Sequence, residues 1–162
     1  MKTSLKITTL AAITFALLGQ AWLSASQPAW RCMNVFAEGS GPLVIPLGFG
    51  PQAVTFGNVP GMLSSIVASI EGGPGALHLT LQHTFISTDT ARPGTFTTED
   101  RAVCAPAGPD PGVCRVNDVL TIVSGTGIFA NPDGSLRNHG IIDFNTFSLT
   151  FSIRGRVCGD GL

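Results

Sequence analysis

Residues 125–134 read GTGIFANPDG, a stretch whose glycines could cradle a phosphate, shape a metal loop or bend a sheet. A phosphate-binding loop ends in Gly-Lys-Ser/Thr and continues into a helix, and this stretch has neither feature. A calcium loop needs several acidic ligands at alternate positions, whereas Asp133 is the only acid here. The stretch is therefore predicted to be structural. Gly125 and Gly127 permit a bend in a closing sheet, and Gly134 completes a hairpin turn.

Around this stretch, the chain from about residue 30 onward alternates apolar and polar side chains and shows no helical periodicity. Glycine and proline clusters such as EGSGP (38–42), GFGP (48–51) and EGGPG (71–75) separate the alternating segments. Nine strands are predicted: 32–37, 53–56, 63–70, 76–86, 94–103, 114–124, 127–130, 135–144 and 147–157.

This regular spacing predicts a single all-β domain over residues 26–162. The two candidate architectures are a closed antiparallel β-barrel of about eight strands and a β-sandwich. We expect the barrel, because closure removes edge strands, and a domain without lysine lacks a common guard of an exposed edge.

Residues 1–25 are predicted to be a signal peptide. Lys2 and Lys6 precede the apolar segment 7–18, and small residues follow at Ala21 and Ser24, where a signal peptidase could cut. No later segment approaches the roughly 18 apolar residues of a membrane-spanning helix. We expect a protein that is secreted or periplasmic and has no membrane span.

Removal of this segment leaves a domain with seven arginines, ten acidic residues and no lysine, and the chain has no tyrosine. These absences exclude a Schiff-base lysine, a phosphate-loop lysine and a tyrosine acid. The acidic balance argues against nucleic acid or an anionic membrane surface as a partner.

The four cysteines all lie after the predicted signal peptide, and an even count in an exported chain favours two disulfides. Of the three possible pairings we favour Cys104–Cys114, around a proline-rich loop, and Cys32–Cys158, between the first and last strands. No Cys-x-x-Cys pair is present, and the three histidines are scattered, so neither a metal site nor a cofactor is predicted.

The motif from Gly125 to Phe129, completed by Gly134, resembles the glycine signature of the allene oxide cyclase and dirigent-protein barrels. The chain then ends in GRVC (155–158), as in many secreted bacterial relatives, and the resemblance covers roughly residues 118–158. It implies an eight-stranded antiparallel barrel with an apolar cavity, often in a trimer, so a homo-oligomer is expected. No position matches a catalytic residue of either family.

Strand alternation also predicts which side chains point into the barrel. In ALHLTLQHTFIS (76–87), His83 shares a face with leucines, and Asp118 and Asn138 fall on the apolar faces of their own strands. A bulge at residues 117–118 would instead turn Asp118 outward. The segment 99–101, Glu-Asp-Arg, is interpreted as a solvated strand end. The apolar interior is expected to consist of Leu77, Leu79, Leu81, Phe85, Leu120, Ile122, Phe144, Phe147, Leu149 and Phe151.

These faces predict a ligand site and no assigned catalytic residue. The expected function is an exported barrel that binds a small apolar molecule or serves a structural role without turnover. One alternative is an allene oxide cyclase-like or isomerase-like enzyme that uses His83 and Asp118 as a base, and another is a surface-interaction module. The residues expected to bind the ligand are His83, Asp118, Asn138, Phe85, Phe144 and Phe151.

Overall fold

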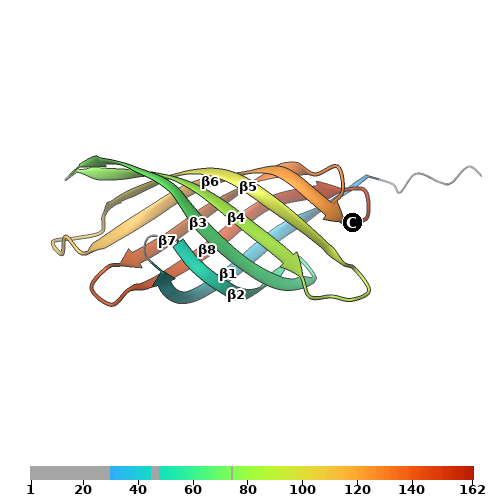
Figure 1. Cartoon of the computed structure of the whole chain (residues 1–162), viewed down its shortest axis with the longest axis horizontal. Helices are drawn as coiled ribbons and strands as arrows, with labels where there is room; N and C mark the ends of the chain where they lie inside the picture. The colour runs from blue at the N-terminus through green and yellow to red at the C-terminus, as the bar shows by residue number, and fades with distance from the viewer. Residues whose placement is uncertain (1–29, 45–47, 74) are drawn as a thin grey trace, which may run out of the picture.

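A computed structural model describes residues 30–44, 48–73 and 75–162, so the predicted signal peptide lies outside the described residues. These residues form a closed barrel in which each antiparallel strand pairs with the next along the chain and the last pairs with the first (Figure 1). The barrel is confirmed over the sandwich. In the described ranges no helix has the length and apolarity needed to cross a membrane.

The strands are β1 (Arg31–Val44), β2 (Gly48–Phe56), β3 (Val59–Gly73), β4 (Ala76–Ser87), β5 (Gly94–Pro106), β6 (Val113–Gly127), β7 (Asp133–Asp143) and β8 (Ser148–Gly159).

The pairing of β1 with β8 closes the barrel. It runs from Arg31 opposite Gly159 to Pro42 opposite Ser148. Within it Cys32 faces Cys158, and the two form a disulfide with their Cα atoms 3.9 Å apart. The second disulfide joins Cys104 of β5 to Cys114 of β6 across the loop between these strands. Both predicted pairings are therefore present.

The GTGIFANPDG stretch contains the end of β6, the β6–β7 connection and the start of β7, and the separate strand predicted at 127–130 is wrong. Gly127 adopts a φ of +61°, and the next two residues turn the chain. The Phe129 N–H donates to the Thr126 carbonyl at 3.1 Å, and the Ala130 N–H donates to the Gly127 carbonyl at 3.0 Å. A side chain at Gly125 would collide with the Phe129 carbonyl oxygen. These glycines therefore shape the backbone, as predicted.

Strands β1, β2 and β3 are longer than predicted, because several glycines interpreted as breaks lie inside strands. The ring of Phe151 occupies the space where a side chain at Gly39 would lie, and the ring of Phe85 does the same at Gly61. In these strands glycine permits close approach of an aromatic ring from inside the barrel, and the strand continues.

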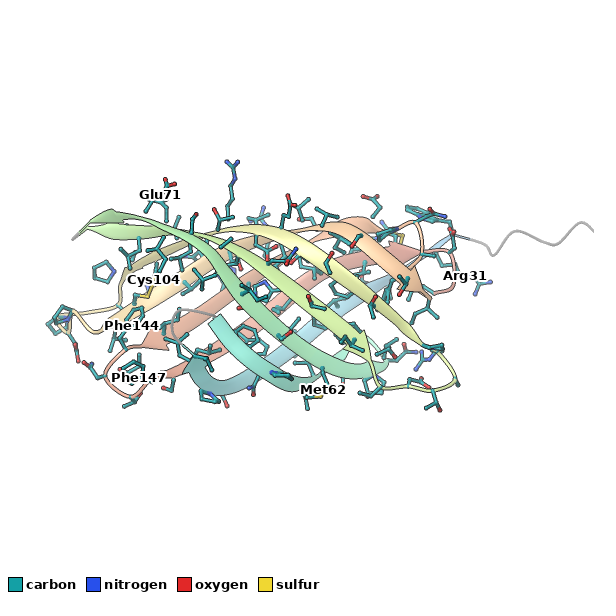
Figure 2. The ribbon with its side chains drawn as sticks, in the orientation of Figure 1. Arg31, Met62, Glu71, Cys104, Phe144 and Phe147 are labelled. Atoms are coloured by element: carbon teal, nitrogen blue, oxygen red, sulfur yellow. A yellow bond between two sulfur atoms is a disulfide. The ribbon has the colours of Figure 1, made fainter. Side chains whose placement is uncertain are left out.

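The barrel interior has two apolar halves. At one end, called here the Phe129 end, the rings of Phe56, Phe85, Phe96 and Phe129 pack together with centroid separations of 4.6 to 5.7 Å. At the other end, called here the Cys104 end, a smaller cluster packs around the Cys104–Cys114 disulfide. Figure 2 shows Cys104 and Phe144 at this end. The smaller cluster consists of Leu79, Leu81, Ala102, Cys104, Cys114 and Val116.

Most of the predicted apolar interior is buried, but Phe147 is not. Its side chain is 55% exposed, and its φ of +50° places it in the turn before β8, which begins at Ser148. The alternating pattern of β8 continues one residue into this turn, so alternation alone does not identify where the strand begins. Leu77 and Phe144 are half-buried at the Cys104 end, and the buried members are Leu79, Leu81, Phe85, Leu120, Ile122, Leu149 and Phe151.

The two disulfides are expected to stabilise the barrel to different degrees. Serine at both Cys104 and Cys114 should lower the free energy of unfolding by about 3 kcal/mol, and serine at both Cys32 and Cys158 by about 5 kcal/mol. The reason is that the sequence separations are 10 and 126 residues, and the longer loop loses more entropy in the unfolded chain. Denaturant unfolding of the two double variants measures the difference, and the reverse order would contradict this account.

Candidate functional site

A layer of buried polar side chains separates the two apolar halves of the barrel. These side chains come from five consecutive strands, β3 to β7, and none is more than 8% exposed. The strand register brings neighbours together, because Ser65 lies opposite His83 and Asp118 lies opposite Asn138. The polar layer consists of Ser65, His83, Thr98, Asp100, Asp118 and Asn138.

His83 is held by β5 through both its ring and its backbone. Its Nδ1 lies 2.5 Å from Asp100 Oδ2, and its backbone N–H donates to Thr98 Oγ1 at 3.1 Å. The Thr98 hydroxyl in turn donates to Asp100 Oδ2 at 2.8 Å. Asp100 thus fixes the orientation of the His83 ring through Nδ1 and leaves Nε2 for another contact. The arrangement orients a histidine base.

Four oxygen atoms of the layer have no hydrogen-bond partner. They are both carboxylate oxygens of Asp118, Oδ1 of Asp100 and Oδ1 of Asn138. Buried polar atoms normally have partners, so this cluster of unpaired acceptors needs an explanation. The ion pairs among the described residues are His83–Asp100 and Arg92–Asp89, so no arginine there neutralises Asp118. The donors of the layer therefore leave these four oxygens unpaired, and His83 is the group that offers positive charge there.

Burial raises the pKa of the Asp118 carboxyl to about 6. The nearby negative charge of Asp100 raises this pKa further, whereas His83 lowers it. Desolvation is the largest of these effects, because burial removes water from the charged carboxylate, and it outweighs the lowering of the pKa by His83 and by the Val119 backbone N–H. Asp118 thus changes charge close to neutral pH.

A cavity of about 60 Å³ extends from the polar layer toward the Cys104 end. His83 and Asn138 provide polar groups at its inner wall, and apolar side chains provide most of the remaining lining. A buried water needs roughly 10 to 15 Å³ of such space, so the cavity has room for a few waters or for a small organic group. The apolar lining includes Leu43, Phe49, Leu81, Val116, Ile142 and Phe151.

The structure brings together most of the residues predicted to bind a ligand. His83, Asp118 and Asn138 all point inward in the polar layer, and Phe151 lines the cavity. The register runs unbroken through Asn117 and Asp118, so the alternative of a bulge there is wrong.

Two of the predicted ligand-binding residues lie elsewhere. Phe85 is fully buried among the rings of the Phe129 end, 4.6 Å from Phe56 between ring centroids. Phe144 lines a separate apolar groove beside Cys104 and Cys114 at the other end. Both were placed on the correct face of the sheet, but their positions along the barrel axis keep them from the polar layer.

Sequence reasoning missed Asp100 and Thr98. Asp100 lies between Glu99 and Arg101 and was interpreted as part of a solvated strand end, but its side chain is 1% exposed. The signal was present in the alternation of the predicted strand 94–103, because counting by two from the buried Phe96 reaches Thr98 and Asp100. The neighbouring charges face outward and obscured this pattern.

The unpaired Asp118 carboxylate should lower stability at neutral pH. Because its folded pKa of about 6 lies above the ordinary 3.8, the destabilisation is present above pH 6 and disappears as the pH falls toward 4. Asp118→Asn should therefore raise the free energy of unfolding at pH 7 by up to about 3 kcal/mol, with no gain near pH 4. Denaturant unfolding across this pH range, with a chelator present, measures the effect.

Asp133→Asn is the matched control, because Asp133 is exposed on the neighbouring strand β7. It should change stability little at either pH. A loss of stability at pH 7 in Asp118→Asn would contradict the proposed cost of the buried carboxylate.

Comparisons of the chain with protein-family models, with curated proteins and with solved structures found no match.

Proposed function

We propose that the protein is a binding protein that holds a small, mainly apolar molecule inside its barrel. The observation that carries this proposal is the cavity of about 60 Å³, whose walls are apolar and whose inner end meets the polar layer at His83 and Asn138. Binding sites for small molecules combine these features: apolar walls supply affinity, and a few polar groups fix the orientation.

The dimensions of the cavity define the class of ligand. Its volume suits a molecule of a few heavy atoms, or one end of a longer chain that extends toward the Cys104 end. One polar group on that end would bind Nε2 of His83 or the Oδ1 acceptor of Asn138. A hydroxyl fits this position, because it donates one hydrogen bond and accepts others.

A second candidate function is an isomerase-like enzyme. The specific observation in its favour is the Thr98–Asp100–His83 chain of hydrogen bonds, which orients a histidine at the wall of an apolar cavity. A histidine that is oriented by a carboxylate and keeps one free ring nitrogen can act as a general base. The resemblance to the allene oxide cyclase and dirigent-protein barrels supports this candidate, and the homo-oligomer that it implies belongs to the same proposal.

We also propose that the protein is exported. The two disulfides are typical of an oxidising compartment. The pattern of residues 1–25, with lysines before an apolar segment and small residues after it, supports secretion or release into a periplasm.

Filling the cavity tests the binding proposal. Val116→Phe should abolish the binding of short n-alkanols, because Val116 lines the cavity and the larger ring would occupy it. Val119→Phe is the matched control, because Val119 is 48% exposed on the outer face of the same strand and should leave binding unchanged. Binding is measured by chemical-shift perturbation in NMR spectra, which also verify that each variant is folded. Equal binding to the two variants, or no alkanol binding to the wild type, would contradict the proposal.

A further inference from the structure

We infer that the polar layer is a binding site for one divalent transition-metal ion, such as Zn²⁺, held by His83, Asp100 and Asp118. The inference goes beyond the proposed function, since it concerns an ion within the polar layer and needs no organic ligand. It rests on the spacing of the three side chains, on their burial and on the unpaired oxygen atoms around them.

The spacing of the three side chains suits a common ion. One potential ligand atom from each of His83, Asp100 and Asp118 lies within 4.8 Å of the other two. Tetrahedral zinc with bonds of about 2.1 Å separates its ligands by about 3.4 Å. Nδ1 of His83 and Oδ2 of Asp100 lie 2.5 Å apart, so the ion would displace the proton of their hydrogen bond to solvent, and rotation of the two side chains would separate them. The residues lie on the adjacent strands β4, β5 and β6 of a closed barrel, which limits their separation.

The charge of the site also favours a cation. Asp100 and Asp118 are 1% and 3% exposed, and among the described residues neither forms an ion pair with an arginine. Two buried carboxylates that share one histidine partner leave negative charge to be offset, and a divalent ion would offset it. The four unpaired atoms of the layer are all oxygens, which a cation satisfies without any hydrogen-bond donor.

Asn138 provides a candidate fourth ligand. It lies opposite Asp118 in the β6–β7 register, its side chain also points inward, and its Oδ1 has no partner. Directly opposite side chains in a sheet have Cβ atoms about 5 Å apart, so the amide oxygen is close to the carboxylate. Thr98 orients Asp100 by donating to its Oδ2, as residues behind a metal ligand commonly do.

The donor set selects the kind of ion. Ca²⁺ takes six to eight oxygen ligands, and Mg²⁺ favours six oxygens with several waters, whereas this site offers one imidazole and few oxygens. The four cysteines form disulfides and are not available as thiolate ligands. Imidazole and carboxylate together suit Zn²⁺ and its neighbours in the first transition row.

The inference is tested with the disulfide-bonded protein after chelator treatment and dialysis. Isothermal titration with Zn²⁺ should show one equivalent bound, and Co²⁺ should give the visible absorption of a low-coordinate site. Mg²⁺ and Ca²⁺ should not compete at a hundredfold excess. His83→Gln and Asp118→Asn should each weaken Zn²⁺ binding at least a hundredfold, because each removes one ligand.

Two surface variants are the matched controls. His78→Gln and Glu99→Gln alter exposed side chains on β4 and β5, and both should bind Zn²⁺ like the wild type. Thermal unfolding without metal verifies that every variant is folded. The inference is overturned if the wild type binds no stoichiometric ion, or if His83→Gln and Asp118→Asn bind as tightly as the wild type.

These experiments can contradict the metal-site inference and the binding proposal independently of each other. Val116→Phe blocks the cavity but leaves the three ligands in place, so it should retain Zn²⁺. Loss of alkanol binding with retained Zn²⁺ separates the metal site from the proposed binding function.

Discussion

The pairing of β1 with β8 is the constraint on which the rest of the structure depends. Along a meander of antiparallel strands, every second side chain lies on the same face of the sheet. In an open sheet that face would lie against solvent or a second layer. Once β8 returns to β1 and Cys32 bonds to Cys158, that face becomes an enclosed interior (Figure 1). The polar residues on consecutive strands then converge, and closure creates the candidate site.

The interior combines a cluster of aromatic rings that stabilises the fold with a polar layer that destabilises it. At the Phe129 end, stacked and edge-to-face rings fill the barrel, and such pairs add to the stabilisation from apolar burial. The polar layer does the opposite, since a half-satisfied buried network is less stable than an apolar core of the same volume. The ring cluster and the two disulfides offset that cost. A ligand or an ion that binds the unpaired oxygens of the polar layer would recover part of the lost stability, which connects these oxygens to function.

Much of this architecture could be predicted from periodicity and composition. Alternation gave the all-β fold and the inward faces of His83, Asp118 and Asn138, and the proline-rich loop indicated the Cys104–Cys114 pair. Alternation also contained Asp100, but the charges on either side of it favoured a surface interpretation. Alternation with a period of two assigns a residue to one face of the sheet regardless of its neighbours. For Asp100 this alternation predicts the observed burial better than the charges of Glu99 and Arg101 do.

Other features could not be predicted from a one-dimensional pattern. Alternation assigns Phe85 and His83 to the same face, but their levels along the axis depend on the stagger between strands, which the closed barrel sets. For this reason Phe85 and Phe144 were expected at the site and lie at opposite ends of the barrel. Glycines such as Gly39 were interpreted as breaks because the aromatic ring that covers Gly39 comes from β8, far along the chain.

The central claim is that closure of the barrel buries the Asp118 carboxylate, which forms no ion pair with an arginine among the described residues, so that desolvation determines its pKa. Carboxyl ¹³C NMR titration of the metal-free protein, labelled at aspartate, tests it most directly. The account predicts that Asp118 titrates near pH 6, while hydrogen bonds from Arg92 and Thr146 hold the pKa values of Asp89 and Asp143 below 3.8. Titration of Asp118 at or below the ordinary aspartate value of 3.8 would show that the carboxylate is solvated and would contradict the account.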